Sequence, residues 1–313
     1  MKLFFLNGFG YAADSLILLL QSVTAGQAAL EFKPSFSYGL TAAAYSGMLV
    51  GALFWGFSAD IIGRKFAFNT SLFICSIFAI VAGASPSWTV LGLFVALCSF
   101  GAGGNLVLDT TIFLEFLPGK YQWILTLMAC WWGFAPVVAA GFAWPLLSIP
   151  KYFCDGETEP CNWHTNVGWR AIWFGNGALV LICSILRVTI IRMKETPKYL
   201  LGKGEDEEVI RTFEYISHKY NRPCSLTLES LQACGEIKST YGGSRFGFAE
   251  FKAHLAGLFA TKKLGISTCL LWLSWVSTTL PRIVCYSRSD HLPDVDRPRL
   301  STVLRLPARV PQI

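Results

Sequence analysis

Two long stretches without a charged residue place the strongest constraint on how this chain folds. One runs from Phe66 to Leu108 and the other from Tyr121 to Pro150. A helix crosses the hydrocarbon core of a bilayer with about 20 apolar residues, so the first stretch is long enough for two crossings, with a break at Ser85-Pro86-Ser87. Only 15% of the residues are charged, against about 25% in ordinary soluble domains. The pattern predicts an integral membrane protein with several spans.

Further apolar segments predict an all-α membrane protein, with a six-helix N-terminal bundle in residues 1–191 and part of a seventh span. The six spans are expected at about Met1–Leu30, Pro34–Ala59, Phe66–Gly83, Trp88–Leu106 with a polar continuation to Glu115, within Gln122–Leu147, and at Trp169–Ile191. In the second span, Gly47 and Gly51 are four residues apart and share a helix face. Small residues on one face predict close packing against a neighbouring helix.

The remaining residues are predicted to form three parts. Residues 192–263 are a polar loop with short amphipathic helices at Glu205–Tyr220, Leu226–Lys238 and Phe248–Thr261, and residues 264–280 begin the seventh span. Residues 281–313 hold five prolines, six arginines and no lysine. This last segment is expected to be a disordered tail or non-native coding sequence, such as a shifted reading frame or an unspliced intron. In the second case the chain is truncated.

The distribution of lysine and arginine predicts the orientation of the spans. Short connections on one side hold Lys2, Arg64, Lys65 and Lys120, and the 192–263 loop adds twelve bases to that side. The opposite side holds Lys33, Lys151 and Arg170. The positive-inside rule places the first side, with the 56–65 turn and the 192–263 loop, in the cytosol. The expected location is the plasma membrane.

The cysteines and the overall charge exclude several classes of function. Cys154 and Cys161 lie in the loop on the oxidising side, where they either form a disulfide or stay free. No His/Cys cluster has the spacing of metal ligands, and no catalytic triad or phosphate-binding loop appears. We therefore predict no metal, no cofactor and no enzyme activity. The net charge of +6 is attributed to the cytosolic side of the spans, and no nucleic acid is expected as a partner.

A dense charged turn separates the second and third spans, in the sequence from Gly56 to Lys65. Gly56 and Asp60 are one helical turn apart, so the glycine is expected to admit a neighbouring helix and the aspartate to accept hydrogen bonds from a backbone end or a base. Arg64 offers a planar fork for a carboxylate.

Two glutamates are expected to reach that arginine, because Glu115 and Glu195 lie at the ends of other spans on the same side. Such a network would latch the helices together in one state and release them in another. The alternative is ordinary interfacial charge, because ion pairs exposed to water contribute little.

The spacing Gly56-x-x-x-Asp60-x-x-Gly63-Arg64-Lys65 resembles the loop signature between the second and third spans of the major facilitator superfamily. Phe113–Pro118 is similar to the acid-and-proline ending of the fourth span in sugar-porter-type members. Glu195–Leu200 resembles the Glu-Ser-Pro-Arg motif after the sixth span, with Lys198 in place of the arginine. The run from Gly101 to Pro118 is most similar to a fungal branch related to synaptic-vesicle-glycoprotein-like transporters.

This resemblance covers about residues 1–280 and implies a transporter of two six-helix halves, of which this chain carries the first half and part of a seventh helix. The predicted cytosolic gate, which is the network around the 56–65 turn, comprises Gly56, Asp60, Gly63, Arg64, Lys65, Glu115, Glu195 and Lys198.

Four polar residues inside spans are candidates for handling a substrate or a proton: Asp14, Asp109, Asn105 and Gln21. A carboxylate inside a span costs about 2.5–3.5 kcal/mol on insertion scales, so it usually faces a cavity or a partner. Asp14 lies deeper and suits proton coupling or a bond to a neighbouring helix. For Asp109, the alternative is that its side chain reaches the membrane interface. For Asn105 and Gln21, the alternative is that they form hydrogen bonds between helices.

The sequence therefore predicts a secondary active transporter, coupled to protons, that moves a small solute such as a sugar or an organic acid by alternating access. Its partners would be the solute, the proton and the lipid bilayer. The alternative is a non-transporting, receptor-like or regulatory remnant with the same half-fold.

Overall fold

The computed structural model describes residues 2–149, 151–152, 154, 160–191, 194–221, 223–233, 235 and 256–289. The chain divides into two compact units, residues 1–244 and 245–313. The described residues form helices, turns and loops, with no strand among them. The predicted all-α class is confirmed.

Among the described residues of the first unit, six helices are long and apolar enough to cross a membrane. They are α1 (Lys2–Phe32), α2 (Gly39–Ile62), α3 (Arg64–Gly83), α4 (Trp88–Phe116), the pair α5 (Ile124–Met128) and α6 (Cys130–Ser148), and α7 (Val167–Leu186). Between α4 and α5 lies one 3₁₀ turn, η1 (Gly119–Tyr121), and α7 continues into a π-helical turn, η2 (Arg187–Ile191). Each of the six predicted spans corresponds to one of these helices.

Two breaks divide the apolar runs into separate helices, and the first has a local cause. The Ser87 side chain accepts a hydrogen bond from the Val90 backbone N at 3.4 Å, so it caps the N-terminus of α4, and α3 and α4 become separate spans. The fifth predicted span breaks at Ala129, between α5 and α6. Its two prolines, Pro136 and Pro145, lie inside α6.

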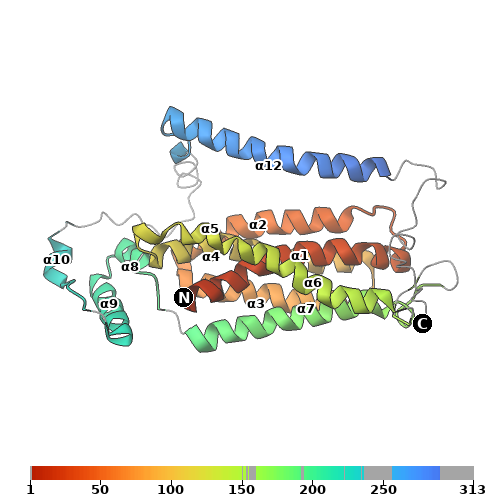
Figure 1. Ribbon diagram of the computed structural model, residues 1–313, viewed down its shortest axis with the longest axis horizontal. Coiled ribbons are helices and arrows are strands. Elements are labelled where there is room, and N and C mark those ends of the chain that lie inside the picture. The colour runs from red at the N-terminus through yellow and green to blue at the C-terminus, as the bar shows by residue number, and fades with distance from the viewer. Residues whose placement is uncertain are drawn as a thin grey trace, which may run out of the picture. The chain divides into compact units, whose positions relative to one another are not determined.

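Helix α4 is the centre of the bundle. It packs against α1, α2 and α3, while α7 packs against α3 and α6, and α6 against α1 (Figure 1). The largest buried cluster draws apolar residues from all six long helices, including Ile17, Leu72 and Trp173. The helices thus form one packed bundle around α4.

Glycines let α2 and α4 approach at backbone distance. A Cβ added to Gly47 would overlap the carbonyl oxygen of Ala96, and one added to Gly51 would overlap that of Phe100. From the facing helix, a Cβ on Gly103 would overlap the carbonyl oxygen of Met48. The predicted close packing at Gly47 and Gly51 is confirmed, and it explains why α2 and α4 share the most extensive helix contact in the bundle.

Replacing Gly51 by alanine is expected to destabilise the bundle by about 1–3 kcal/mol, because overpacking forces a backbone shift. Gly56→Ala on the same helix is the matched control, since its Cβ would meet only Val107 Cγ1 at 3.8 Å. Both changes improve helix propensity equally. Thermal unfolding in detergent measures the difference, and equal melting temperatures for the two variants would contradict the packing argument.

Three short helices follow the bundle within the first unit: α8 (Pro197–Lys203), α9 (Asp206–Tyr220) and α10 (Leu228–Gln232). Tyr199, Leu200 and Val209 form their small buried core. The predicted helix at Glu205–Tyr220 is therefore confirmed, and only the first part of the Leu226–Lys238 helix is seen among the described residues.

The second unit contains α12 (Lys262–Ser289). This helix includes the predicted start of a seventh span and continues past Leu280 into the segment predicted as a tail. It is not among the six helices that are long and apolar enough within the described residues to cross a membrane. Most of the predicted Phe248–Thr261 helix and residues 290–313 lie outside the described residues.

Candidate functional site

The turn between α2 and α3 consists of one glycine. Gly63 has a φ of +101°, a conformation that residues with a side chain rarely adopt. The chain therefore reverses within a single residue, and Arg64 becomes the first residue of α3. The sharp reversal brings the last turn of α2 beside the first turn of α3.

Arg64 is the centre of an ion-pair network at this turn. Its side chain is only 9% exposed, and its Nη2 lies 2.9 Å from Oδ1 of Asp60, four residues earlier. Its Nη1 pairs with the carboxylate of Glu115, in the last turn of α4. One guanidinium thus joins α2, α3 and α4, as its planar fork allows.

Glu195 binds the same turn through the backbone. Its Oε1 accepts a hydrogen bond from the Lys65 backbone N at 3.0 Å, and its carboxylate lies against Gly63. A carboxylate at this place stabilises the N-terminus of α3, where backbone N–H groups are free and the helix dipole is positive.

Tyr199 adds a second contact from the segment after α7. Its hydroxyl donates to the Ile61 carbonyl oxygen at 3.2 Å. Burial raises the pKa of Tyr199 above its ordinary value, so the hydroxyl keeps the proton that it donates. Glu195 and Tyr199 together attach the start of α8 to the α2–α3 turn.

The structure therefore gathers most of the predicted gate residues, but not all of them as expected. Lys65 contributes its backbone while its side chain is exposed, and Lys198 is exposed on α8. The expectation that Gly56 admits a neighbouring helix is wrong for this conformation, because a Cβ there would make only an ordinary contact, with Val107. The close approach of α2 to α4 lies further along the helix, at Gly47 and Gly51.

A second charged group lies inside the bundle, between α4 and the end of α7. The Asp109 side chain is 0% exposed, and its Oδ1 accepts a hydrogen bond from Nη2 of Arg187 at 2.6 Å. The alternative that Asp109 reaches the membrane interface is therefore wrong. Its carboxylate is neutralised inside the protein, as is usual for charges at this depth.

Arg187 makes three further contacts. Its Nη1 donates to the Phe68 carbonyl oxygen at 2.9 Å and to Oδ1 of Asn105 at 3.3 Å, and its guanidinium lies 3.6 Å from the centre of the Phe68 ring. Asn105 Oδ1 also accepts from Ser71 Oγ at 3.0 Å. Asn105 therefore bridges helices in this conformation, one of the two roles considered for it.

Two predicted residues of α1 have different environments. Nε2 of Gln21 donates to Thr41 Oγ1 of α2 at 3.1 Å, so it too bridges helices. Asp14 is 1% exposed, and neither of its carboxyl oxygens has a hydrogen-bond partner in the described part of the chain. Asp14 is the buried carboxyl of the bundle whose charge is least compensated.

The opposite end of the bundle is held by Arg170, in the first turn of α7. Its side chain is 2% exposed, and its Nη2 donates to Oε1 of Glu31 at 2.5 Å. Its Nη1 donates to the carbonyl oxygens of Gly83 at 3.1 Å and Ser85 at 2.8 Å. The rings of Trp163 and Trp169 lie 3.8 Å and 4.2 Å from its guanidinium carbon. Arg170 therefore joins the ends of α1, α3 and α7.

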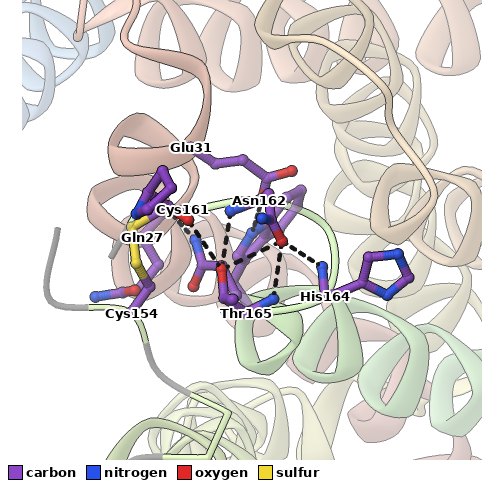
Figure 2. The surroundings of a disulfide bond; sticks show 10 residues. Gln27, Glu31, Cys154, Cys161, Asn162, His164 and Thr165 are labelled. Atoms are coloured by element: carbon purple, nitrogen blue, oxygen red, sulfur yellow. Dashed lines mark hydrogen bonds between the residues drawn. A yellow bond between two sulfur atoms is a disulfide. The ribbon is translucent and has the colours of Figure 1, made fainter. Parts of the chain in front are cut away.

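A disulfide lies at the same end. Cys154 and Cys161 are bonded, beside Gln27 of α1 and the turn that Asn162 and Thr165 form (Figure 2). Oδ1 of Asn162 accepts from the Thr165 backbone N at 3.1 Å. The bond closes the loop that leads into α7 next to Arg170.

Sequence reasoning missed Arg187, Glu31, Asn7 and Tyr199. Arg187 could have been found from the sequence, because an arginine inside a predicted span is by default a candidate functional residue with a partner. Glu31 and Arg170 are charged residues at predicted span ends, and no local pattern pairs them. Asn7 donates from Nδ2 to the Asp109 backbone oxygen at 3.0 Å, a contact that has no signature in sequence.

A bundle of six apolar helices with charged pairs buried between them defines an integral, multi-pass membrane protein. The family model described as "Sugar (and other) transporter" matches residues 5–277. The chain belongs to this family of major facilitator transporters, and the family is not enzymatic.

Curated relatives match across most of this chain. It is 36% identical to "MFS siderochrome iron transporter 1" of Ceriporiopsis subvermispora, covering 87% of this chain and 53% of the relative. It is 35% identical to "Major facilitator-type transporter hxnZ" of Emericella nidulans, covering 88% and 52%. "Synaptic vesicle 2-related protein" of Rattus norvegicus is 25% identical, with 88% and 44% covered. The chain thus spans about half the length of these relatives, and the predicted resemblance to fungal and synaptic-vesicle-related transporters is confirmed.

Solved structures show the same fold. The partially occluded, inward-open conformation of the xylose transporter XylE from E. coli has a TM-score of 0.55 at 15% identity, over 74% of this chain and 55% of that one. Its inward-open conformation gives a TM-score of 0.53 at 16% identity, over 79% and 57%.

Proposed function

We propose that this chain forms the N-terminal half of a proton-coupled secondary transporter for a small solute such as a sugar or an organic acid. Alternating access would rock this bundle against a second half around a central site. One relative is named a siderochrome iron transporter and another a major facilitator-type transporter. One solved structure of the fold is titled a proton:xylose symporter. The family membership supports transport, and the solute class is part of the proposal.

The observation that carries the proton coupling is Asp14. A buried carboxyl without a hydrogen-bond donor strongly favours its neutral, protonated form, and Asp14 has this environment. Asp109 lies close enough to interact with it electrostatically. We propose that the two acids handle the proton, with Asn105 and Gln21 as polar residues of the same interior.

The proposed gate is the network around Arg64. In this conformation its pairs with Asp60 and Glu115 join three helices, and Glu195 holds the α2–α3 turn. Breaking these contacts would release the helix ends when the transporter changes state. The excess of lysine and arginine on this side supports a cytosolic position for the turn and the 192–263 loop. The disulfide at the other end supports an oxidising side there, and the plasma membrane is the proposed location.

The test is uptake of labelled sugars and organic acids into proteoliposomes under an imposed pH gradient. The chain is reconstituted alone and together with the separately expressed second half of the Emericella nidulans relative. Uptake is expected to depend on the gradient, and Asp14→Asn is expected to reduce the gradient-driven rate by about tenfold or more, equivalent to about 1.4 kcal/mol or more in the barrier.

Glu207→Gln is the matched control, because Glu207 is an acid with a 74% exposed side chain on α9. Its uptake is expected to equal that of the unchanged chain. Absence of flux for every solute and gradient would contradict transport and favour the non-transporting remnant. Flux that ignores the gradient and the Asp14 substitution would contradict the proton coupling alone.

A further inference from the structure

The π-helical turn η2 begins with a member of the interior charge pair formed by Arg187 and Asp109. It begins at Arg187, directly after α7 ends at Leu186. π-helical turns are rare and frequently lie at functional sites, because the wider turn redirects side chains from the regular helical register. Here the first residue of the turn is Arg187, whose buried side chain contacts α3 and α4.

The position of η2 depends on contacts that Arg187 makes with other helices. The guanidinium binds the Asp109 carboxylate, the Phe68 carbonyl oxygen and the Asn105 side chain. Only Asp109 among these three partners carries a charge. Its ionised carboxylate is therefore the group that makes the buried guanidinium tolerable inside the span.

Helix α1 passes directly against this pair. A Cβ on Gly10 would overlap both Nη2 of Arg187 and Oδ2 of Asp109, so the backbone of α1 closes the site on that side. Three titratable groups among the described residues interact with the pair: Tyr11 and Asp14 on α1 and Cys183 on α7. Cys75 on α3 interacts with Asp14. None of these four groups is a cation, so in the described part of the chain Arg187 is the cation that faces both acids.

The other end of the same segment binds the gate. Glu195 accepts from the Lys65 backbone N at 3.0 Å, and Tyr199 donates to the Ile61 carbonyl oxygen. Arg187 and Glu195 are eight positions apart in sequence. Arg187 is thus attached to the interior acid, and Glu195, a few residues further along the chain, is attached to the α2–α3 turn.

We propose that Arg187 is a positioning residue that couples the protonation of Asp109 to the contact between Glu195 and the α2–α3 turn. The inference rests on the proposed function in assigning a proton to Asp109. When the Asp109 carboxylate takes up that proton, the ion pair becomes a hydrogen bond to a neutral acid, while the guanidinium keeps its charge. The uncompensated cation then favours a shift of η2 out of the bundle, and Glu195 releases the Lys65 amide.

The test is amide hydrogen exchange by mass spectrometry on the whole chain in nanodiscs, which requires no transport. In Asp109→Asn, exchange at residues 187–191, 194–204 and at Lys65 is expected to rise about tenfold, because local opening governs exchange. The unchanged chain should reach the same rates when the pH is lowered from about 8 to about 5, after correction for intrinsic exchange. Asp109→Asn should show no further response to pH.

Two controls keep the test decisive. Glu31→Gln breaks the other buried pair, with Arg170, and should leave exchange at residues 194–204 unchanged. Asp109→Glu keeps the charge and should keep the protection at high pH, which separates loss of charge from damage to the fold. If Asp109→Asn does not fold, the pH response of the unchanged chain and its persistence in Asp109→Glu decide the question.

The proposal is overturned if exchange at residues 194–204 stays within about twofold of the unchanged chain in Asp109→Asn. It is also overturned if the pH response persists in that variant, since another group, such as Asp14, would then be titrating. Uptake that fails while the exchange response is present would contradict the proposed transport and leave this coupling standing.

Discussion

Replacing Arg187 by glutamine is expected to lower the free energy of unfolding by about 3–5 kcal/mol, the cost of removing one partner from a buried pair. The substitution leaves the Asp109 carboxylate charged at 0% exposure and removes the donor to the Phe68 carbonyl oxygen. Denaturant unfolding in mixed micelles, followed by circular dichroism, measures the change.

The double variant Arg187→Gln with Asp109→Asn separates charge from packing. It removes the unpaired carboxylate and leaves two neutral amides that can bond to each other, so we expect it to recover about half or more of the lost stability. If the loss of unfolding free energy in the double variant equals the sum of the losses in the two single variants, the pair contributes through packing and not through its charges.

Replacing Arg170 by glutamine is expected to have an effect of similar size, about 3–5 kcal/mol, at the other end of the bundle. Glu31, with a side chain 9% exposed, would lose its cation and keep only the Trp169 Nε1 donor at 3.0 Å. The carbonyl oxygens of Gly83 and Ser85 would lose their shared donor. Thermal unfolding of the purified chain with its disulfide intact measures the effect.

Two companion variants make this result interpretable. Arg170→Lys keeps the charge but cannot bond Glu31 and both carbonyl oxygens in the same plane, so we expect an intermediate loss. Arg211→Gln removes an arginine with a 66% exposed side chain from an ion pair on α9, and such pairs contribute about 0–1 kcal/mol. A loss in Arg211→Gln equal to that in Arg170→Gln would refute the role assigned to burial.

Three buried arginines join the helices of the bundle at three different levels. Arg64 joins α2, α3 and α4 at the end that carries the short helices, and Arg170 joins α1, α3 and α7 at the other end. Arg187 lies inside and joins α7 to α3 and α4. Helix α3 is common to all three. Opening either end of the bundle would therefore require breaking the contacts of an arginine that lies on α3 or is bound to it.

Sequence patterns predicted the helices well because each span is decided locally. The uncharged runs, the Ser85–Ser87 break and the small residues Gly47 and Gly51 are patterns of a few residues, and the structure agrees at each of them. The approach expected at Gly56 was wrong, because the spacing of a motif does not reveal which turn of a helix faces its neighbour.

The candidate sites were predicted only in part. The motif pointed to Arg64, Glu115 and Glu195 as a group, and their contacts now lie at one turn. Asp109 was recognised as a charge inside a span, yet its partner was not, and Asn105 was left between two roles. The missing information was in each case which helix lies opposite, and no short pattern contains it.

The sequence by itself determined the class of this protein and the places of six spans, because the thickness of a bilayer sets the length of an apolar helix whatever its neighbours are. Only the tertiary structure decided how the buried charges pair. Arg187 meets Asp109 across 78 positions, and Arg170 meets Glu31 across 139. Such pairs form only when distant helices pack, because a charge inside a membrane protein is stable where a counter-charge lies in contact with it.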